Sequence, residues 1–205
     1  MIYGVLAVKT GLTAGAAQAM SLVLFAGSAQ FMIVQLLGAG TPVVVIVVST
    51  FIINLRHALY SASLAPHLKP LSPLWKGLLA YFLVDEAYAI GAVRYQQADG
   101  APAKHWYLLG AGLAIWTSWQ LGTALGIFLG AQIPAGWSLD FTLALTFIAL
   151  LVPTLKDRPM LLAALSAGIT AVASYSLPYK FGLILAALVG IAAGLWSERK
   201  WPASH

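Results

Sequence analysis

The sequence predicts an all-α fold, a polytopic bundle of about seven transmembrane helices, on three observations. Hydrophobic residues make up 60% of the 205-residue chain and charged residues only 8%, which is too little polar surface to coat a soluble globule. Apolar runs of the length that a bilayer requires follow one another along most of the chain. Several of the few charged residues lie inside those runs, where a charge usually marks a transport path.

Short polar or proline-containing stretches separate the expected spans. The first four cover about residues 13–37, 42–64, 74–93 and 106–130, and three shorter ones cover about residues 139–155, 160–177 and 181–196. Two of the short ones are compatible with either a re-entrant hairpin or a small tilt. Residues 1–8 are apolar but too short to cross and lack the features of a signal peptide, so we expect the end of a truncated helix.

The whole chain, residues 1–205, is expected to form one integral membrane transport domain, because it contains no soluble stretch long enough to fold separately. The basic residues between the spans favour a cytoplasmic C-terminus by a small margin. Because these residues are scattered singly, the net charge of +5 indicates loop cations at the membrane ends. We therefore expect contact with the lipid bilayer and no nucleic-acid partner.

Residues 25–31, Phe-Ala-Gly-Ser-Ala-Gln-Phe, interrupt the first span near its middle. Glycine and serine weaken a helix locally, and the amide of Gln30 is costly in hydrocarbon. One interpretation is a broken helix whose free N–H groups at Gly27 and Ser28 hold a substrate carboxylate. The other is a small-residue face for close helix packing.

Asn54, Arg56 and His57 lie inside the second span, after a purely apolar run. At about 3.6 residues per turn, Asn54 and His57 lie near one face and Arg56 projects elsewhere. Arg56 either snorkels to an interface or faces inward and pairs with a buried acid. His57 is either a proton carrier, because histidine titrates near neutral pH, or a structural hydrogen-bonding residue.

Asp85 and Glu86 lie near the middle of the third span. Adjacent positions diverge by about 100° on a helix, so one acid can face a pore while the other pairs laterally. A short loop is the alternative, but the apolar and aromatic residues on both sides argue against it. Two other positions are more ambiguous. Asp140 either binds substrate or caps a helix at an interface, and Trp119 either lines a cavity or packs in the bundle or against lipid.

The glycine stripe (Gly122, Gly126 and Gly130) repeats a G-x-x-x-G spacing and predicts a close helix contact. The sequence has no cysteine, no H-E-x-x-H zinc motif, no G-x-S-x-G elbow and no phosphate-binding loop. We therefore expect neither an enzyme nor a bound cofactor or metal.

These segments, in this order and at this spacing, resemble the AzlC-type branched-chain amino-acid permeases. The resemblance extends over nearly the whole chain and is carried by residues 26–31, 54–57, 85–86, 139–141, 147–150 and 156–159. It implies the large subunit of an exporter in the bacterial inner (plasma) membrane, with valine, leucine, isoleucine and also methionine as candidate substrates. It also implies a small membrane partner subunit of the AzlD type, and family members usually carry an additional N-terminal hydrophobic helix.

An amino acid is a zwitterion with an apolar side chain, so its site needs an acid, hydrogen-bond donors and a small apolar pocket. The expected substrate-binding residues are Gly27, Ser28, Gln30, Asn54, Arg56, Asp85, Glu86, Trp119 and Asp140. Export against a gradient is expected to be driven by an ion gradient, with Glu86 or His57 as the proton-coupling residue. The alternative function is a non-transporting membrane scaffold or sensor subunit, with the glycine stripe as its main surface.

Overall fold

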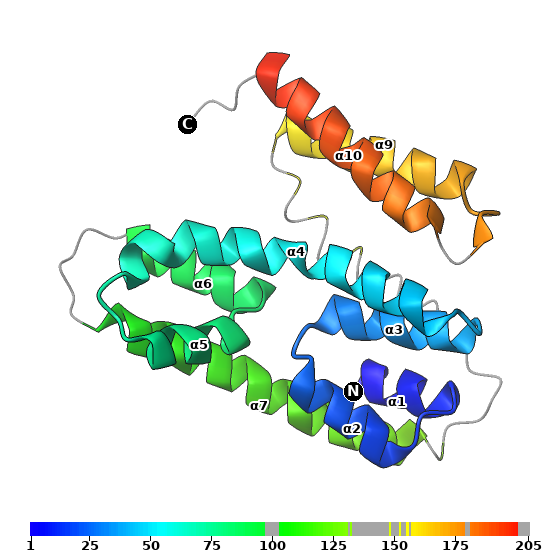
Figure 1. Ribbon diagram of the computed structural model, residues 1–205, viewed down its shortest axis with the longest axis horizontal. Helices are drawn as coiled ribbons and strands as arrows, with labels where there is room; N and C mark the ends of the chain where they lie inside the picture. The colour runs from blue at the N-terminus through cyan, green and yellow to red at the C-terminus, as the bar shows by residue number, and fades with distance from the viewer. Residues whose placement is uncertain are drawn as a thin grey trace. The chain divides into compact units, whose positions relative to one another are not determined.

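The computed structural model describes residues 1–96, 103–130, 157–178 and 181–200, with single residues at 132, 148, 152 and 155. The regular elements in these ranges are all helices, which confirms the predicted all-α class (Figure 1). The chain falls into two compact units, residues 1–135 and 136–205. The expectation of one transport domain over the whole chain stays a prediction.

Seven helices make up the described part of the first unit. They are α1 (Ile2–Lys9), α2 (Ala14–Val23), α3 (Gly27–Gly38), α4 (Val43–Leu68), α5 (Pro73–Phe82), α6 (Asp85–Gln96) and α7 (Lys104–Gly130). In the second unit, α9 (Arg158–Ala173) and α10 (Phe181–Lys200) pack as an antiparallel pair. Their direction follows from two contacts, because Gly182 lies against Ser174 and Gly194 against Ala163.

Within the described ranges, α4, α7 and α10 are long and apolar enough to cross a membrane. The 26 residues of α4 and 27 residues of α7 rise about 1.5 Å each, so both helices exceed the roughly 30 Å of a hydrocarbon core. These helices coincide with the spans expected near residues 42–64, 106–130 and 181–196. Most of the span expected over residues 139–155 lies outside the described residues. The expected total of about seven spans counts residues 13–37 and 74–93 as crossings, and the two hairpins described below lower that total.

The first expected span is broken, as the composition of residues 25–31 predicts. α2 ends at Val23 and α3 begins at Gly27, with Ala26 in an extended conformation between them. The amide Nε2 of Gln30 donates to the carbonyl of Leu24 at 2.5 Å. The polar side chain therefore satisfies a carbonyl that the break leaves without a helical partner.

α2 and α3 form a hairpin that enters the unit and returns to the same end. A Cβ on Gly38, at the end of α3, would lie 3.1 Å from Cγ2 of Thr10, which lies just before α2 begins. At the other end of the hairpin, Ser28 contacts Arg56 halfway along α4. Residues 13–37 thus reach the middle of the unit and turn back, which corrects the expectation of a crossing span.

α5 and α6 form a second hairpin, which enters from the opposite end. Trp75 packs against Trp106 near the start of α7, with ring centroids 4.7 Å apart, and Phe82 then reaches Trp116 at 6.4 Å. On the way back, a Cβ on Gly91 would lie 2.7 Å from Cδ1 of Leu108. The single span expected over residues 74–93 is therefore also wrong, because Leu83 and Val84 divide it and reverse its direction.

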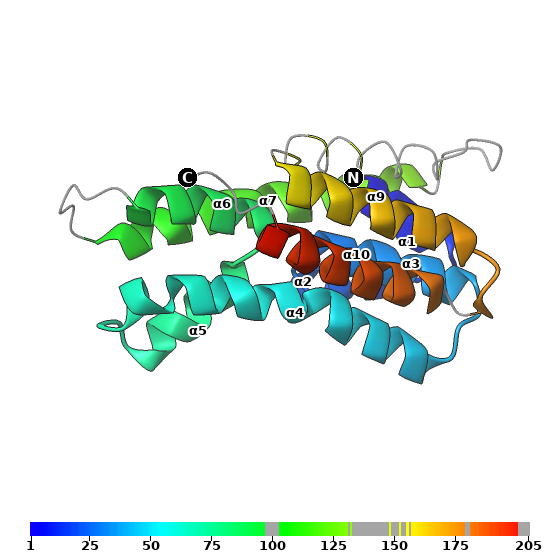
Figure 2. The ribbon, with the colours of Figure 1, turned by 90° about the horizontal axis from the view of Figure 1, so that it is seen from above.

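The two hairpin tips, residues 24–26 and 83–84, meet near the middle of the long helices. The rings of Phe25 and Phe82 are 6.5 Å apart edge to face, and the hydroxyl of Tyr81 donates to the carbonyl of Leu22 at 2.5 Å. Figures 1 and 2 show α2–α3 and α5–α6 at opposite ends of α4 and α7. Each tip also contains the same backbone bond across two residues, Ala26 N to Leu24 O and Val84 N to Phe82 O.

These relations define two repeats within the first unit. The first repeat is α2, α3 and α4, with 10, 12 and 26 residues, and the second is α5, α6 and α7, with 10, 12 and 27. In each repeat the hairpin returns to the end where it entered, and the long helix then runs to the opposite end. The second repeat therefore starts at the end opposite to the first and runs in the opposite direction. Inverted repeats with broken helices at mid-membrane are a common plan of membrane transporters.

The glycine stripe contacts a helix, as predicted, and that helix is α1 of the same chain. Built Cβ atoms on Gly122 and Gly126 would meet the backbone of Met1, and one on Gly130 would lie 3.0 Å from Cα of Val5. Small residues let the two backbones approach this closely. Because α1 covers the stripe, it is not the free surface that the scaffold alternative requires.

Candidate functional site

Arg56 of α4 joins the two hairpin tips. Its Nη1 lies 2.6 Å from Oδ2 of Asp85, the first residue of α6, and its Nη2 donates to the hydroxyl of Ser28 in the first turn of α3. Of the two sequence alternatives for Arg56, the structure shows the inward one, paired with an acid. We call the Arg56–Asp85 contact the central ion pair.

The central ion pair is only partly enclosed by the described residues. The side chains of Arg56 and Asp85 remain 28% and 41% exposed, so a solute can still reach both charges. Asp85 lies at the N-terminus of α6, where unsatisfied backbone N–H groups favour a negative charge. Its Oδ1 accepts a hydrogen bond of 2.9 Å from the hydroxyl of Tyr60.

Three polar atoms in the turn of α4 that contains Arg56 are buried without a partner among the described residues. They are Oδ1 of Asn54, Nε of Arg56 and Nε2 of His57. Buried polar atoms in folded proteins nearly always have a hydrogen-bond partner. One donor N–H of Arg56, one imidazole nitrogen of His57 and one acceptor oxygen of Asn54 in this turn thus lack a partner in the described part of the chain.

A second group of predicted residues surrounds the tip of the first hairpin. The indole Nε1 of Trp119 donates to Oε1 of Gln30 at 3.1 Å, and the indole stacks on Tyr3 with ring centroids 6.3 Å apart. A Cβ on Gly27 would lie 2.9 Å from Cη2 of Trp119. Trp119 therefore packs inside the bundle and holds the start of α3, and a glycine is required at residue 27 for this close approach.

Two predicted residues do not join these groups. Glu86 is exposed and makes neither an ion pair nor a hydrogen bond to a described residue, because the adjacent Asp85 takes the inward direction. Asp140 lies outside the described residues. The predicted roles of both in binding, and of Glu86 and His57 in proton coupling, stay predictions.

Comparison with known proteins identifies the family of this chain. Residues 1–133 match the family model described as AzlC protein, and this range contains the central ion pair and both hairpins. The chain belongs to the AzlC protein family. The resemblance inferred from the sequence is thereby confirmed.

Relatives of this AzlC protein are membrane proteins. An uncharacterized membrane protein of Archaeoglobus fulgidus is 32% identical over 95% of this chain and 85% of its own length. The inner membrane protein YgaZ of Escherichia coli is 25% identical over 95% of this chain and 83% of its own length. An uncharacterized membrane protein of Helicobacter pylori is 27% identical over 76% of this chain and 68% of its own length. No solved structure matches the chain.

The structure adds Tyr60, which sequence reasoning did not single out, to the AzlC site, and gives Tyr88, a candidate pocket residue, its contacts. Tyr60 bonds to Asp85, and its ring stacks on that of Tyr88 with centroids 4.3 Å apart. The hydroxyl of Tyr88 donates to Oγ of Ser63 at 3.0 Å. Tyr60 lies one helical turn after Arg56, and Tyr88 one turn after Asp85, so the spacing of neighbours on a helix would have found both.

A buried polar cluster also joins α2 to α7. Gln18 Nε2 donates to Oε1 of Gln120 at 2.7 Å, and Gln120 Nε2 donates to the carbonyl of Ser21 at 3.0 Å. The hydroxyls of Ser21 and Thr123 lie 3.3 Å apart. We call these four residues the α2–α7 seam. It is hydrogen-bonded and contains no ionisable side chain.

Proposed function

We propose that this AzlC protein exports branched-chain amino acids across the bacterial inner membrane, driven by an ion gradient. The observation that carries the proposal is the central ion pair, a half-exposed arginine and aspartate between two half-helix N-termini in the middle of long apolar helices. Charges at such a depth are costly and are usually retained for transport. Inverted repeats of this plan bind their substrates at the same position.

The charges of the site are complementary to an amino-acid zwitterion. In the proposed complex the substrate carboxylate binds Arg56 and the first N–H groups of α3, and the ammonium binds Asp85. Each charge of the ion pair is thus matched by an opposite charge of the substrate, and no charge is buried without a partner. Asn54 and His57 supply further polar atoms in the same turn of α4.

The surroundings of the site favour an apolar side chain on the substrate. Phe25, Phe82 and Tyr81 form an aromatic group where the hairpin tips meet, with ring centroids from 4.9 to 6.5 Å apart. An aliphatic side chain gains free energy by leaving water for such a surface. Valine, leucine and isoleucine, and also methionine, are therefore the substrates to test first.

The cellular setting is part of the proposal. YgaZ of Escherichia coli is an inner membrane protein, and we place this chain in the same kind of membrane, as a multi-pass protein with a cytoplasmic C-terminus. We further propose a small AzlD-like membrane subunit as its partner. The alternative role as a scaffold or sensor has no observation in its favour, because α1 covers its suggested surface.

The experiment is counterflow in proteoliposomes that contain the purified protein, with and without the partner subunit. Vesicles loaded with unlabelled valine, leucine, isoleucine or methionine are diluted into the labelled amino acid. We expect transient accumulation by the wild type and none by Asp85→Asn or Arg56→Gln. Glu198→Gln, on the exposed surface of α10, is the matched control and should behave like the wild type. Absence of wild-type counterflow of every tested amino acid, with the partner present, would contradict the proposal.

A further inference from the structure

A row of polar and aromatic side chains runs along the contact between α4 and α6. The two helices are parallel there, because Arg56 meets Asp85, Tyr60 meets Tyr88 and His67 meets Tyr95. The row, which we call the α4–α6 seam, consists of Asp85, Tyr60, Tyr88, Ser63, His67 and Tyr95. Its members are three and four residues apart on α4 and three and seven residues apart on α6, so they occupy one face of each helix.

The first half of the seam is connected to the central ion pair by hydrogen bonds and ring stacking. Tyr60 donates to Asp85 at 2.9 Å, its ring stacks on Tyr88 at 4.3 Å, and Tyr88 donates to Ser63 at 3.0 Å. Each of these groups except the carboxylate can both accept and donate a proton. One helical turn separates Ser63 from His67 along α4.

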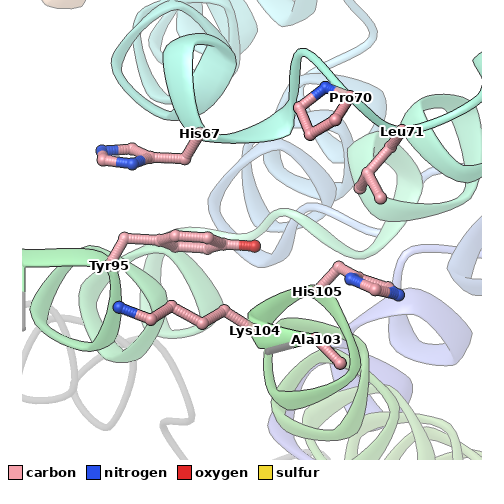
Figure 3. A pocket seen from close by; sticks show the side chains of 7 residues that line it. All are labelled: His67, Pro70, Leu71, Tyr95, Ala103, Lys104 and His105. Atoms are coloured by element: carbon pink, nitrogen blue, oxygen red, sulfur yellow. The ribbon is translucent and has the colours of Figure 1, made fainter. Parts of the chain in front are cut away.

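The far end of the seam opens into a pocket. A cavity of about 330 Å³ lies where α4 and α6 end and α7 begins, and His67, Tyr95 and His105 are among its lining residues. The rings of His67 and Tyr95 stack with centroids 5.1 Å apart. Figure 3 shows Tyr95 between His67 and Lys104, with its hydroxyl directed toward the side of Leu71 and His105. That hydroxyl is buried and has no hydrogen-bond partner among the described residues.

We propose that the α4–α6 seam conducts protons between this pocket and Asp85, and that protonation of Asp85 couples the proton gradient to transport. The inference rests on the proposed function and deepens it by naming the coupling ion, its acceptor and its route. Water in the pocket supplies the proton and bridges the turn between His67 and Ser63. A second water bridges the hydroxyls of Tyr88 and Tyr60, whose rings stack but whose hydroxyls bond to Ser63 and Asp85. The pocket volume is ample for several water molecules.

The proton balance along the seam is as follows. His67 takes a proton from pocket water and passes one through water to Ser63. The hydroxyls of Ser63 and Tyr88 then exchange donor and acceptor roles, and Ser63 passes its own proton to Tyr88. The last transfer moves the hydroxyl proton of Tyr60 to Oδ1 of Asp85, while the water between the two tyrosine hydroxyls gives a proton to Tyr60 and takes one from Tyr88. Asp85 becomes a neutral acid and every tyrosine ends as a phenol. The ammonium of a bound amino acid then loses its ionic partner, so protonation of Asp85 releases the substrate.

The charged and titratable groups around the seam are compatible with this direction of transfer. Arg56 and His57 of α4 lie beside Asp85, and Lys104 and His105 of α7 lie at the pocket with His67 and Tyr95. The α2–α7 seam, at the other hairpin, has only amide and hydroxyl side chains. Of the two seams, the one along α4 and α6 alone contains groups that titrate, so protons enter the site from the α4–α6 end.

The test compares two activities of the same proteoliposomes. Counterflow exchanges one substrate molecule for another and needs no net proton movement, whereas accumulation driven by an imposed pH difference does. We expect His67→Gln, Tyr95→Phe and Tyr88→Phe to retain counterflow but to lose pH-driven accumulation by about tenfold or more, as losses of proton-transfer groups do. Tyr107→Phe, a matched exposed tyrosine on α7, should keep both activities.

The outcomes separate this inference from the proposed function. If the wild type shows no counterflow, the proposed function fails, and the inference with it. If the wild type exchanges substrate but an imposed pH difference does not drive it, or if the three variants retain full pH-driven accumulation, the inference alone is wrong. Loss of both activities together in the variants would assign the seam a structural role and would also overturn it.

Discussion

The two repeats of the first unit have the same helix pattern but carry different chemistry at their tips. α6 of the second repeat begins with Asp85, which is ion-paired and hydrogen-bonded. α3 of the first repeat begins with Gly27 and Ser28, which have no charge and are covered by Trp119 and Arg56. The helix ends therefore present a carboxylate on one side and free backbone N–H groups on the other, which is the pair of groups that a zwitterion requires.

The polar seams near the two hairpins also differ in the types of side chain that they contain. The α4–α6 seam, behind the second tip, contains an acid, a histidine and tyrosines, whereas the α2–α7 seam contains amides and hydroxyls that bond to one another. The two seams are not counterparts in the repeat, which matches the α4–α6 contact with that of α7 and α3. Their difference therefore distinguishes the two ends of the unit and not the two repeats.

The largest expected effect concerns the opposite directions of the hairpins. The chain has no cysteine, so single cysteines can be labelled without background. Gly15→Cys and Ala39→Cys should react with a membrane-impermeant thiol reagent from one side of the membrane, and Lys69→Cys and Ala103→Cys from the other. If residues 15 and 39 were labelled from opposite sides, the first hairpin would be a crossing span and the inverted repeat would be wrong.

The next effect tests the glycine stripe, which α7 has and α4 lacks. Gly126→Leu forces a side chain into the backbone of α1, and we expect it to lower the free energy of unfolding by about 1–3 kcal/mol. Thermal unfolding in detergent measures the change. Gly110→Ala, in open space on the same helix, should leave stability unchanged or raise it. Equal stability of Gly126→Leu and wild type would contradict the α1–α7 contact.

A smaller effect is expected for the tip of the second repeat. Tyr60→Phe removes a hydrogen bond to the carboxylate of Asp85, which is worth about 1.5 kcal/mol at the low end for charged acceptors. This corresponds to about a tenfold rise in the substrate concentration that gives half-maximal counterflow. No change in that concentration would show that Tyr60 does not position Asp85 for binding.

The smallest effect is expected for the tip of the first repeat. Trp119→Phe removes a neutral hydrogen bond to Gln30, worth about 0.7 kcal/mol, and keeps an aromatic ring in place. The half-maximal concentration in counterflow should rise by about threefold, less than for Tyr60→Phe. A larger effect for Trp119→Phe would mean that the uncharged tip contributes more to binding than the charged one.

Part of the site could be predicted because single residues carried the information. Arg56 and Asp85 are charged residues in apolar runs, and their cost in hydrocarbon requires that they find each other or a ligand. Gly27, Ser28 and Gln30 indicated the break between α2 and α3 because their composition weakens a helix. The glycine stripe predicted a close contact through its spacing, but the spacing did not name α1 as the partner.

Other features could not be read from local composition. The break between α5 and α6 falls at Leu83 and Val84, which are apolar and resemble the interior of any span. The hydropathy of a hairpin of two short helices is the same as that of one crossing helix. Nothing in residues 13–37 or 74–93 taken separately states whether the chain crosses or returns.

The amino-acid sequence by itself determined the class of this protein: an apolar, helical, membrane-embedded chain with a few charges placed where hydrocarbon would penalise them. The gain from burying apolar surface and the cost of an isolated charge depend on the type of each residue, so the sequence alone is enough to infer them. Tertiary structure alone decided that two hairpins enter from opposite ends and bring Ser28, Arg56 and Asp85 together. That outcome depends on contacts between residues far apart in the chain, such as Phe25 with Phe82 and Trp75 with Trp106, whose pairing no single segment specifies.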